Sequence, residues 1–113
     1  MSAPPEYEVF AIRYATRGAR RAEAFIDPDP HDGPLPMDYY VWVARSAEAT
    51  VVIDTGFSRD VGERRGRTFL RCPVETLSLL GIQPAEVAHV IVTHLHNDHA
   101  GNLGLFPAAR FHL

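Results

Sequence analysis

Four side chains that can bind a metal ion lie within six residues of one another. They are His94, His96, Asp98 and His99. Divalent zinc takes imidazole nitrogen and carboxylate oxygen as ligands at about 2.0–2.2 Å, so neutral histidine and ionised aspartate are the right chemical types. A lone histidine near an apolar strand is more often a packed or surface side chain. Three histidines and one aspartate this close together favour a metal site instead.

The spacing of these residues suits two metal ions. If the backbone stays extended after Thr93, His94 and His96 project from the same face and can reach one ion. If a helix begins near Asp98, the adjacent Asp98 and His99 point about 100° apart and can reach a second ion beside the first. Asp98 would then lie near the helix N-terminus, where a negative charge is favourable. We therefore expect a dinuclear metal centre.

The elements around these residues can be predicted from the pattern of apolar side chains. Residues 88–93, directly before the four, form a short apolar run typical of a buried strand. Residues 7–15 alternate as a strand does, with Phe10, Ile12 and Tyr14 on one side. The other expected elements are a β-hairpin of residues 38–45 and 50–54, a loop over 27–36, a helix over 74–80 that ends at Gly81, a single turn over 84–87 and a last strand that begins within 106–113.

Length, composition and charge restrict the class of protein. A chain of 113 residues makes about one domain, and 46% hydrophobic with 22% charged residues is ordinary for a globular protein. The formal charge of −3 offers no general attraction for phosphate backbones or anionic lipid, so we expect neither nucleic acid nor a membrane as partner. No apolar run is long enough to cross a bilayer, no export signal is visible, and the single Cys72 cannot form an internal disulfide. These features predict a cytoplasmic location.

Two motifs resemble those of a known family. His94-x-His96-x-Asp98-His99 is similar to the signature of the metallo-β-lactamase superfamily, and residues 52–56, Val-Ile-Asp-Thr-Gly, are similar to its Asp-x-Gly element at a strand end. Within that superfamily the chain most resembles N-acyl-homoserine lactonase-like hydrolases. This further likeness runs through residues 37–42, 64–67, 69–73 and 105–111, and so spans nearly the whole chain.

The resemblance implies an α/β fold, the αββα sandwich of two mixed sheets flanked by helices, with the metals at one sheet edge. Complete members of the family are longer and supply, from later in the chain, another histidine for each metal and a bridging aspartate. Residues 1–113 are therefore expected to be the N-terminal part of a single such domain, its chain stopping in mid-fold. The partner would be a second copy in a homo-oligomer or a complementing C-terminal half.

The resemblance also implies a role for each site residue. His94 and His96 would bind the first zinc ion, and Asp98 and His99 the second, with other divalent metals as alternatives to zinc. Asp54 would be a buried carboxylate beside the site, where an acceptor behind a ligating imidazole fixes the tautomer and orientation of the ring. The alternative for Asp54 is a carboxylate that caps the turn at Gly56.

The implied activity is that of a zinc-dependent hydrolase, of the quorum-quenching lactonase kind. It would open the ring of a small-molecule lactone or ester by metal-activated hydroxide, with Asp98 as the catalytic proton carrier. Two alternatives stay open: another hydrolase of the same fold that acts on thioesters, β-lactams or phosphoesters, and a non-catalytic fragment with an incomplete metal site. One set of apolar side chains could form an acyl-chain groove or belong to the hairpin core: Met37, Tyr39, Tyr40 and Trp42.

Overall fold

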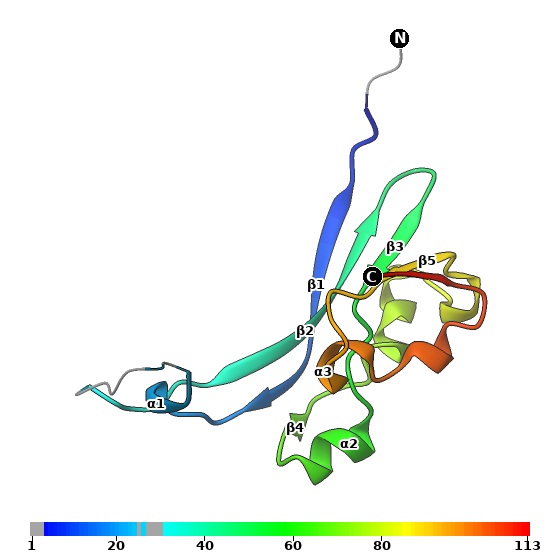
Figure 1. Ribbon diagram of the computed structural model, residues 1–113. Helices are drawn as coiled ribbons and strands as arrows, with labels where there is room; N and C mark the ends of the chain where they lie inside the picture. The colour runs from blue at the N-terminus through cyan, green and yellow to red at the C-terminus, as the bar shows by residue number, and fades with distance from the viewer. Residues whose placement is uncertain (1–3, 25, 27–30) are drawn as a thin grey trace.

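One mixed β-sheet organises the computed structural model, which describes residues 4–24, 26 and 31–113 (Figure 1). Its six strands lie in the order β4-β1-β2-β3-β5-β6. The pairs β1–β2, β2–β3 and β1–β4 are antiparallel, whereas β3–β5 and β5–β6 are parallel. The strands are β1 (Glu8–Arg17), β2 (Met37–Arg45), β3 (Thr50–Ile53), β4 (Thr68–Phe69), β5 (His89–Ile91) and β6 (Arg110–His112).

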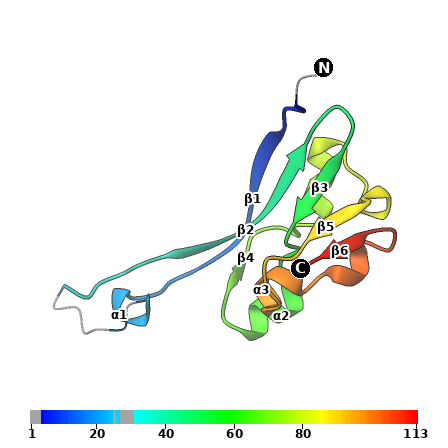
Figure 2. The ribbon, with the colours of Figure 1, turned by 45° about the horizontal axis from the view of Figure 1, so that its top comes forward.

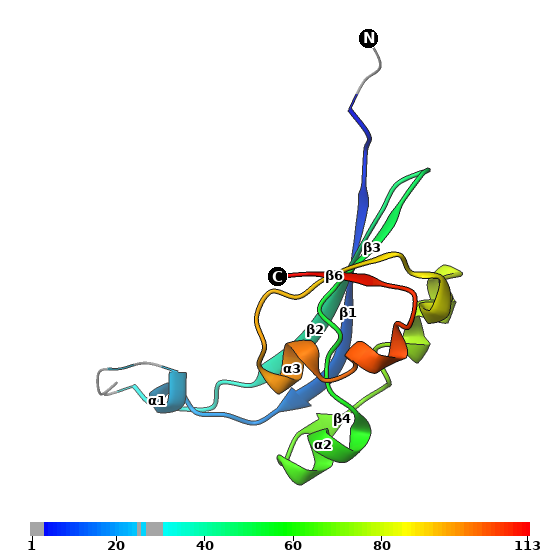
Figure 3. The same cartoon turned by 45° about the vertical axis from the view of Figure 1, so that its right-hand side comes forward.

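Short helices connect and flank the strands, as expected for this fold class. The α-helices are α1 (Arg21–Ala24), α2 (Arg59–Arg64) and α3 (Asn97–Ala100), and the 3₁₀-helices are η1 (Glu75–Leu80), η2 (Pro84–Glu86) and η3 (Leu103–Leu105). Figures 1 and 3 show α2 and α3 close together beside the sheet, while α1 lies far from them at the end of the long β1–β2 pair. None of the helices in the described ranges is long and apolar enough to span a membrane.

Most of the elements predicted from the sequence are confirmed. The strand β1 alternates as expected, with Ile12 and Tyr14 buried and Val9 exposed. The hairpin of β2 and β3 closes through a hydrogen bond from the Ser46 N–H to the Ala49 carbonyl at 2.8 Å. The helix expected over 74–80 is a 3₁₀-helix, and it ends where Gly81 takes a left-handed conformation with φ of 71°. Part of the loop expected over 27–36 lies outside the described residues.

Four elements in the described ranges were not predicted, namely α1, α2, β4 and η3. The sequence between the hairpin and residue 67 reads only as polar, because a helix as short as Arg59–Arg64 has no room for an apolar stripe. Its start is stabilised locally: the Ser58 side chain accepts a hydrogen bond from the Val61 N–H at 3.3 Å. β4 is only two residues long and depends on its pairing with β1.

The two faces of the sheet differ. On the inner face, Ile12, Val43, Val52 and Val90 are buried and belong to one hydrophobic core, which also contains side chains from the connections: Phe57, Val74, Leu77, Val87 and Phe106. On the outer face, the register places Trp42 beside Ile53, and Ile53 beside Ile91. Trp42 is 40% exposed and Ile91 is 39% exposed, so this face is apolar and open to solvent. Figure 2 shows β1 and β2 reaching well beyond the other strands.

Candidate metal centre

The site lies where two neighbouring parallel strands end. β3 and β5 pair in parallel with Ile53 beside Ile91, and the Asp54 N–H continues the pairing by donating to the Ile91 carbonyl at 2.8 Å. The residues that follow β3 and those that follow β5 therefore leave the same sheet edge side by side. The carboxyl ends of parallel strands are where open α/β sheets hold their ligands.

Three of the predicted ligands converge after β5. One potential ligand atom from each of His94, His96 and Asp98 can be chosen so that all three lie within 4.8 Å of one another. His94 and His96 are exposed and Asp98 is half-buried, so the group faces solvent. Ligands of one zinc ion sit about 3–4 Å apart when each is roughly 2 Å from the metal. The three side chains need only a small adjustment to meet at one ion.

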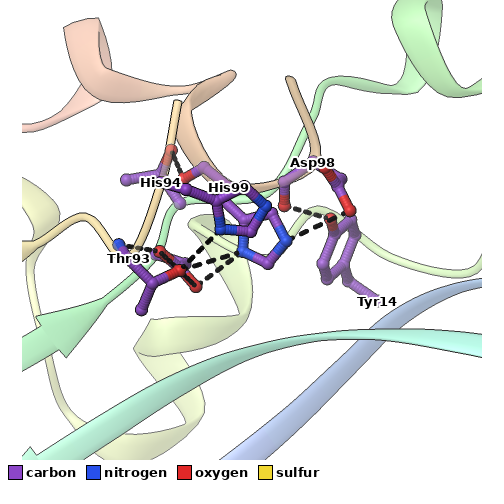
Figure 4. A network of polar contacts seen from close by, with 7 residues as sticks. Tyr14, Thr93, His94, Asp98 and His99 are labelled. Atoms are coloured by element: carbon purple, nitrogen blue, oxygen red, sulfur yellow. Dashed lines mark hydrogen bonds and ion pairs between the residues drawn. The ribbon is translucent and has the colours of Figure 1, made fainter. Parts of the chain in front are cut away.

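His99 lies beside His94, with the two labelled rings close together (Figure 4). Its Nδ1 lies 2.7 Å from a carboxylate oxygen of Asp54, and its Nε2 lies 3.2 Å from Asp98 Oδ2. Its ring centroid is 3.8 Å from that of His94. The structure thus places His94, His96 and Asp98 in one group and His99 between two carboxylates; the sharing of a second ion by Asp98 and His99 stays a prediction.

Asp54 is buried beneath this group, with 3% of its surface exposed. Its carboxylate accepts hydrogen bonds from the Thr93 N–H at 2.8 Å and from the Thr93 hydroxyl at 2.9 Å, besides facing His99. The contact with His99 fixes the orientation of that ring. The role of Asp54 behind a metal ligand stays a prediction. The backbone at Asp54 has a φ of 64°, a left-handed conformation that costs about 1–2 kcal/mol and that aspartate tolerates better than most residues.

A buried polar pair fastens α3 to the end of β3. The Thr55 N–H donates to the His99 carbonyl at 2.7 Å, and the Thr55 hydroxyl accepts from the Asn102 N–H at 3.0 Å. The Asn102 side-chain amide donates to the Thr55 carbonyl at 2.8 Å. Sequence reasoning missed both residues, because partners 47 positions apart leave no local pattern.

Two glycines let the same two segments touch through their backbones. The Gly101 N–H donates to the Gly56 carbonyl at 2.9 Å. A Cβ atom at position 101 would lie 2.5 Å from that Gly56 oxygen and 2.9 Å from the Phe57 Cα. Any side chain at residue 101 would therefore push α3 away from residues 54–56.

Tyr14 reaches the site from β1 and contacts α3. Its hydroxyl donates to the Asp98 carbonyl at 2.9 Å, and its ring is fully buried with an edge-on contact to Phe57 at 5.0 Å between centroids. Burial, together with the nearby negative charge of Asp98, raises the pKa of the Tyr14 phenol above its usual value. Tyr14 is therefore a neutral donor at ordinary pH. The strand pattern indicates only that Tyr14 lies on the same side of the strand as Phe10 and Ile12.

A cavity of about 230 Å³ adjoins the site. Its lining includes Asp98 and His99 together with the four apolar residues of β2 that the sequence singled out: Met37, Tyr39, Tyr40 and Trp42. Tyr39 also packs in the core, with its ring centroid 5.4 Å from that of Phe57. The two interpretations of these residues, groove and hairpin core, are thus both compatible with the structure. His89 and His112 lie elsewhere, on β5 and β6, and contact each other at 3.1 Å.

Sequence comparison finds relatives for most of the chain. The model of the metallo-beta-lactamase superfamily matches residues 35–112. The N-acyl homoserine lactonase AiiB of Agrobacterium fabrum is 32% identical over 89 residues, which cover 67% of this chain and 32% of that protein. Metallo-beta-lactamase domain-containing protein 1 of Xenopus laevis is 42% identical over 62 residues, which cover 53% of this chain and 22% of that protein. The chain therefore spans a third or less of these two relatives.

Comparison of structures identifies the same fold. An N-acyl homoserine lactone hydrolase with the product N-hexanoyl-L-homoserine at its catalytic metal centre matches with a TM-score of 0.72 and 18% identity, over 98% of this chain and 48% of that one. The dizinc quorum-quenching lactonase AidC matches with a TM-score of 0.66 and 17% identity, over 94% of this chain and 41% of that one. The chain thus spans less than half of either structure.

Proposed function

Because the chain belongs to the metallo-beta-lactamase superfamily, we propose that it carries the metal-binding segment of a zinc-dependent hydrolase that opens a lactone ring. The observation that carries this proposal is the convergence of His94, His96 and Asp98 at the end of β5. The relative AiiB, whose name states a lactonase activity, supports the choice of lactone as substrate.

The residues present fit zinc. Two imidazoles and one carboxylate are the donor types that this ion binds in catalytic sites. If His99 donates its Nδ1 proton to Asp54, its Nε2 is left with a free lone pair that points toward Asp98 and the other ligands. His99 can then act as a ligand from the edge of the same group. When bound, paired divalent ions supply a lowered pKa for water and polarise a carbonyl oxygen.

The remaining chemistry belongs to the side chains of this chain. A carboxylate oxygen of Asp98 would accept the proton of the attacking water and later deliver it to the alkoxide that leaves when the ring opens. Asp54 would hold the His99 ring in one orientation through both steps. The cavity beside Asp98, with its methionine and aromatic lining, would receive an acyl chain.

Replacing His96 with alanine tests this proposal most directly. We expect the purified 113-residue chain to bind divalent zinc, measured by elemental analysis, and His96→Ala to lose metal and to lower lactone opening by at least about 100-fold, because a ligand is removed. Lactone opening is followed by acid release at constant pH. His89→Ala is the matched control, since His89 is an exposed histidine of β5 outside the ligand group.

The same measurements separate the alternatives. Release of a thiol from thioesters, without acid release from lactones, would assign a different substrate to the same site. A wild-type chain with no bound zinc at all would favour a non-catalytic fragment. Unchanged metal content and turnover in His96→Ala would remove His96 from the site.

A further inference from the structure

Tyr14 sits at an irregularity of β1. The register of β1 with β2 shifts between Arg13, which lies beside Tyr40, and Ala15, which lies beside Tyr39, so Tyr14 is the extra residue of a β-bulge. Its carbonyl accepts from the Leu70 N–H at 2.8 Å, which ties the bulge to the residue after β4. A bulge bends the strand and re-aims the side chain at that position. Here the re-aimed side chain is a phenol that points to α3.

The helix α3 is too short to hold its own position. Four residues make a single turn, and one turn of helix is unstable by itself in water. Its last carbonyls also have no partner within the helix. The Asn102 N–H, which would serve the Asp98 carbonyl if the helix continued, donates to the Thr55 hydroxyl instead. The Asp98 carbonyl is satisfied by the Tyr14 hydroxyl, from a residue 84 positions away (Figure 4).

We propose that Tyr14 is a positioning residue for Asp98: the phenol at the β1 bulge fixes the peptide of Asp98 so that its carboxylate faces His94 and His96. Thr55 holds the next carbonyl, that of His99, through its N–H and its hydroxyl, which donate to that oxygen at 2.7 and 3.1 Å. The backbone at Asp98 and His99 is thus held by Tyr14 of β1 and by Thr55, just after β3. The consequence for metal binding rests on the proposed function, whereas the fixing of the Asp98 peptide does not.

The phenol also has surroundings that keep it in place. The Tyr14 ring packs against Phe57 and Phe69, with centroid distances of 5.0 and 6.5 Å. The space beside it is closed by Gly56, where a Cβ atom would lie 2.9 Å from Tyr14 Cζ. A ring this confined presents its hydroxyl in one direction, so that removal of the oxygen alone removes the contact to Asp98 without disturbing the packing.

Tyr14→Phe deletes only that oxygen, and Tyr39→Phe deletes a phenol oxygen from the adjacent ring as the matched control. In NMR spectra of the metal-free protein, the chemical shifts of the Asp98 carbonyl carbon and the His99 amide nitrogen should change in Tyr14→Phe. They should stay near their wild-type values in Tyr39→Phe. Zinc affinity should fall roughly three- to tenfold in Tyr14→Phe only, as expected for loss of one hydrogen bond. The wild type offers a test without substitution: an NMR coupling across the hydrogen bond, between the Tyr14 hydroxyl proton and the Asp98 carbonyl carbon.

The outcomes of these measurements support or refute the positioning role of Tyr14. Shifts at Asp98 and His99 that match wild type in Tyr14→Phe, or that move equally in Tyr39→Phe, would overturn the proposal. If Tyr14→Phe fails to fold, the presence or absence of the coupling in wild type decides instead. A wild-type chain that binds no zinc would count against the proposed function and favour a non-catalytic fragment, while the metal-free shifts would still support or refute the role of Tyr14.

Discussion

The candidate metal centre has two halves that are held very differently. The anchored half consists of Asp54, Asp98 and His99, and in it His99 contacts both carboxylates. Hydrogen bonds from Tyr14 of β1 and from Thr55, just after β3, hold the backbone carbonyls of Asp98 and His99. His94 and His96, the open half, are exposed and lie between β5 and α3. His96 is the residue before α3, and its side chain makes no capping hydrogen bond.

The difference teaches where this site obtains its geometry. A ligand that is already oriented loses little conformational freedom when a metal binds, whereas an exposed side chain must be ordered at that moment. In the proposed function, the anchored half would therefore define the position of the ion, and the open half would close on it. Substitutions in the first should change both stability and metal binding, and those in the second should change metal binding alone.

Gly101→Ala should have the largest effect, because it forces the anchored half apart. The added methyl would meet the Gly56 oxygen at 2.5 Å, and relief of that overlap should lower the free energy of unfolding by about 1–3 kcal/mol. Gly104→Ala is the control, since no atom lies within 4 Å of its added Cβ. Denaturant unfolding of both variants measures the difference. Equal free energies of unfolding for the two variants would mean that residues 56 and 101 can move apart without loss of stability.

A pair of histidine substitutions compares the halves directly. His99→Ala should destabilise the fold by about 1–2 kcal/mol, since the buried Asp54 carboxylate loses a partner at 2.7 Å. His94→Ala should change the free energy of unfolding by less than about 0.5 kcal/mol, as exposed substitutions usually do. Both should weaken zinc binding in titration calorimetry. If His94→Ala costs as much stability as His99→Ala, the distinction between the halves is wrong.

Alkaline pH should loosen the anchored half through Tyr14, with the smallest effect of the three. Burial raises the pKa of this phenol in the folded state above the value of about 10 that it has when unfolded. The associated stability is present in full below pH 10 or so and is lost as the pH rises through the folded-state pKa. The midpoint temperature of thermal unfolding should therefore fall more steeply with rising pH for wild type than for Tyr14→Phe. Parallel curves would contradict this.

Much of the scaffold of the site could be predicted because its signals are local. The alternation in β1, the turn of the hairpin and the left-handed Gly81 each depend on neighbouring residues only. The clustering of His94, His96 and Asp98 likewise follows from their closeness in the chain. Sequence comparison then identified the superfamily, in agreement with the motif.

What could not be predicted depends on residues far apart in the sequence. The contact of Tyr14 with Asp98 joins residues 84 positions apart and depends on a β-bulge that no residue type in the sequence predicts. The bond between Thr55 and Asn102 needs the register of β3 with β5. The position of His99 between two carboxylates and against His94 depends on the same register and on the left-handed backbone at Asp54.

The parallel pairing of β3 with β5 also sets the order in which the chain can fold. The hairpin of β2 and β3 joins neighbouring strands across a short turn and can form early, but β5 can add to β3 only after residues 54–88 have closed a long loop. The ligand-bearing segment lies beyond β5, so it takes shape after that slow closure. We therefore expect a metal to bind after the surrounding structure has folded, and to stabilise the native state more than to start its folding.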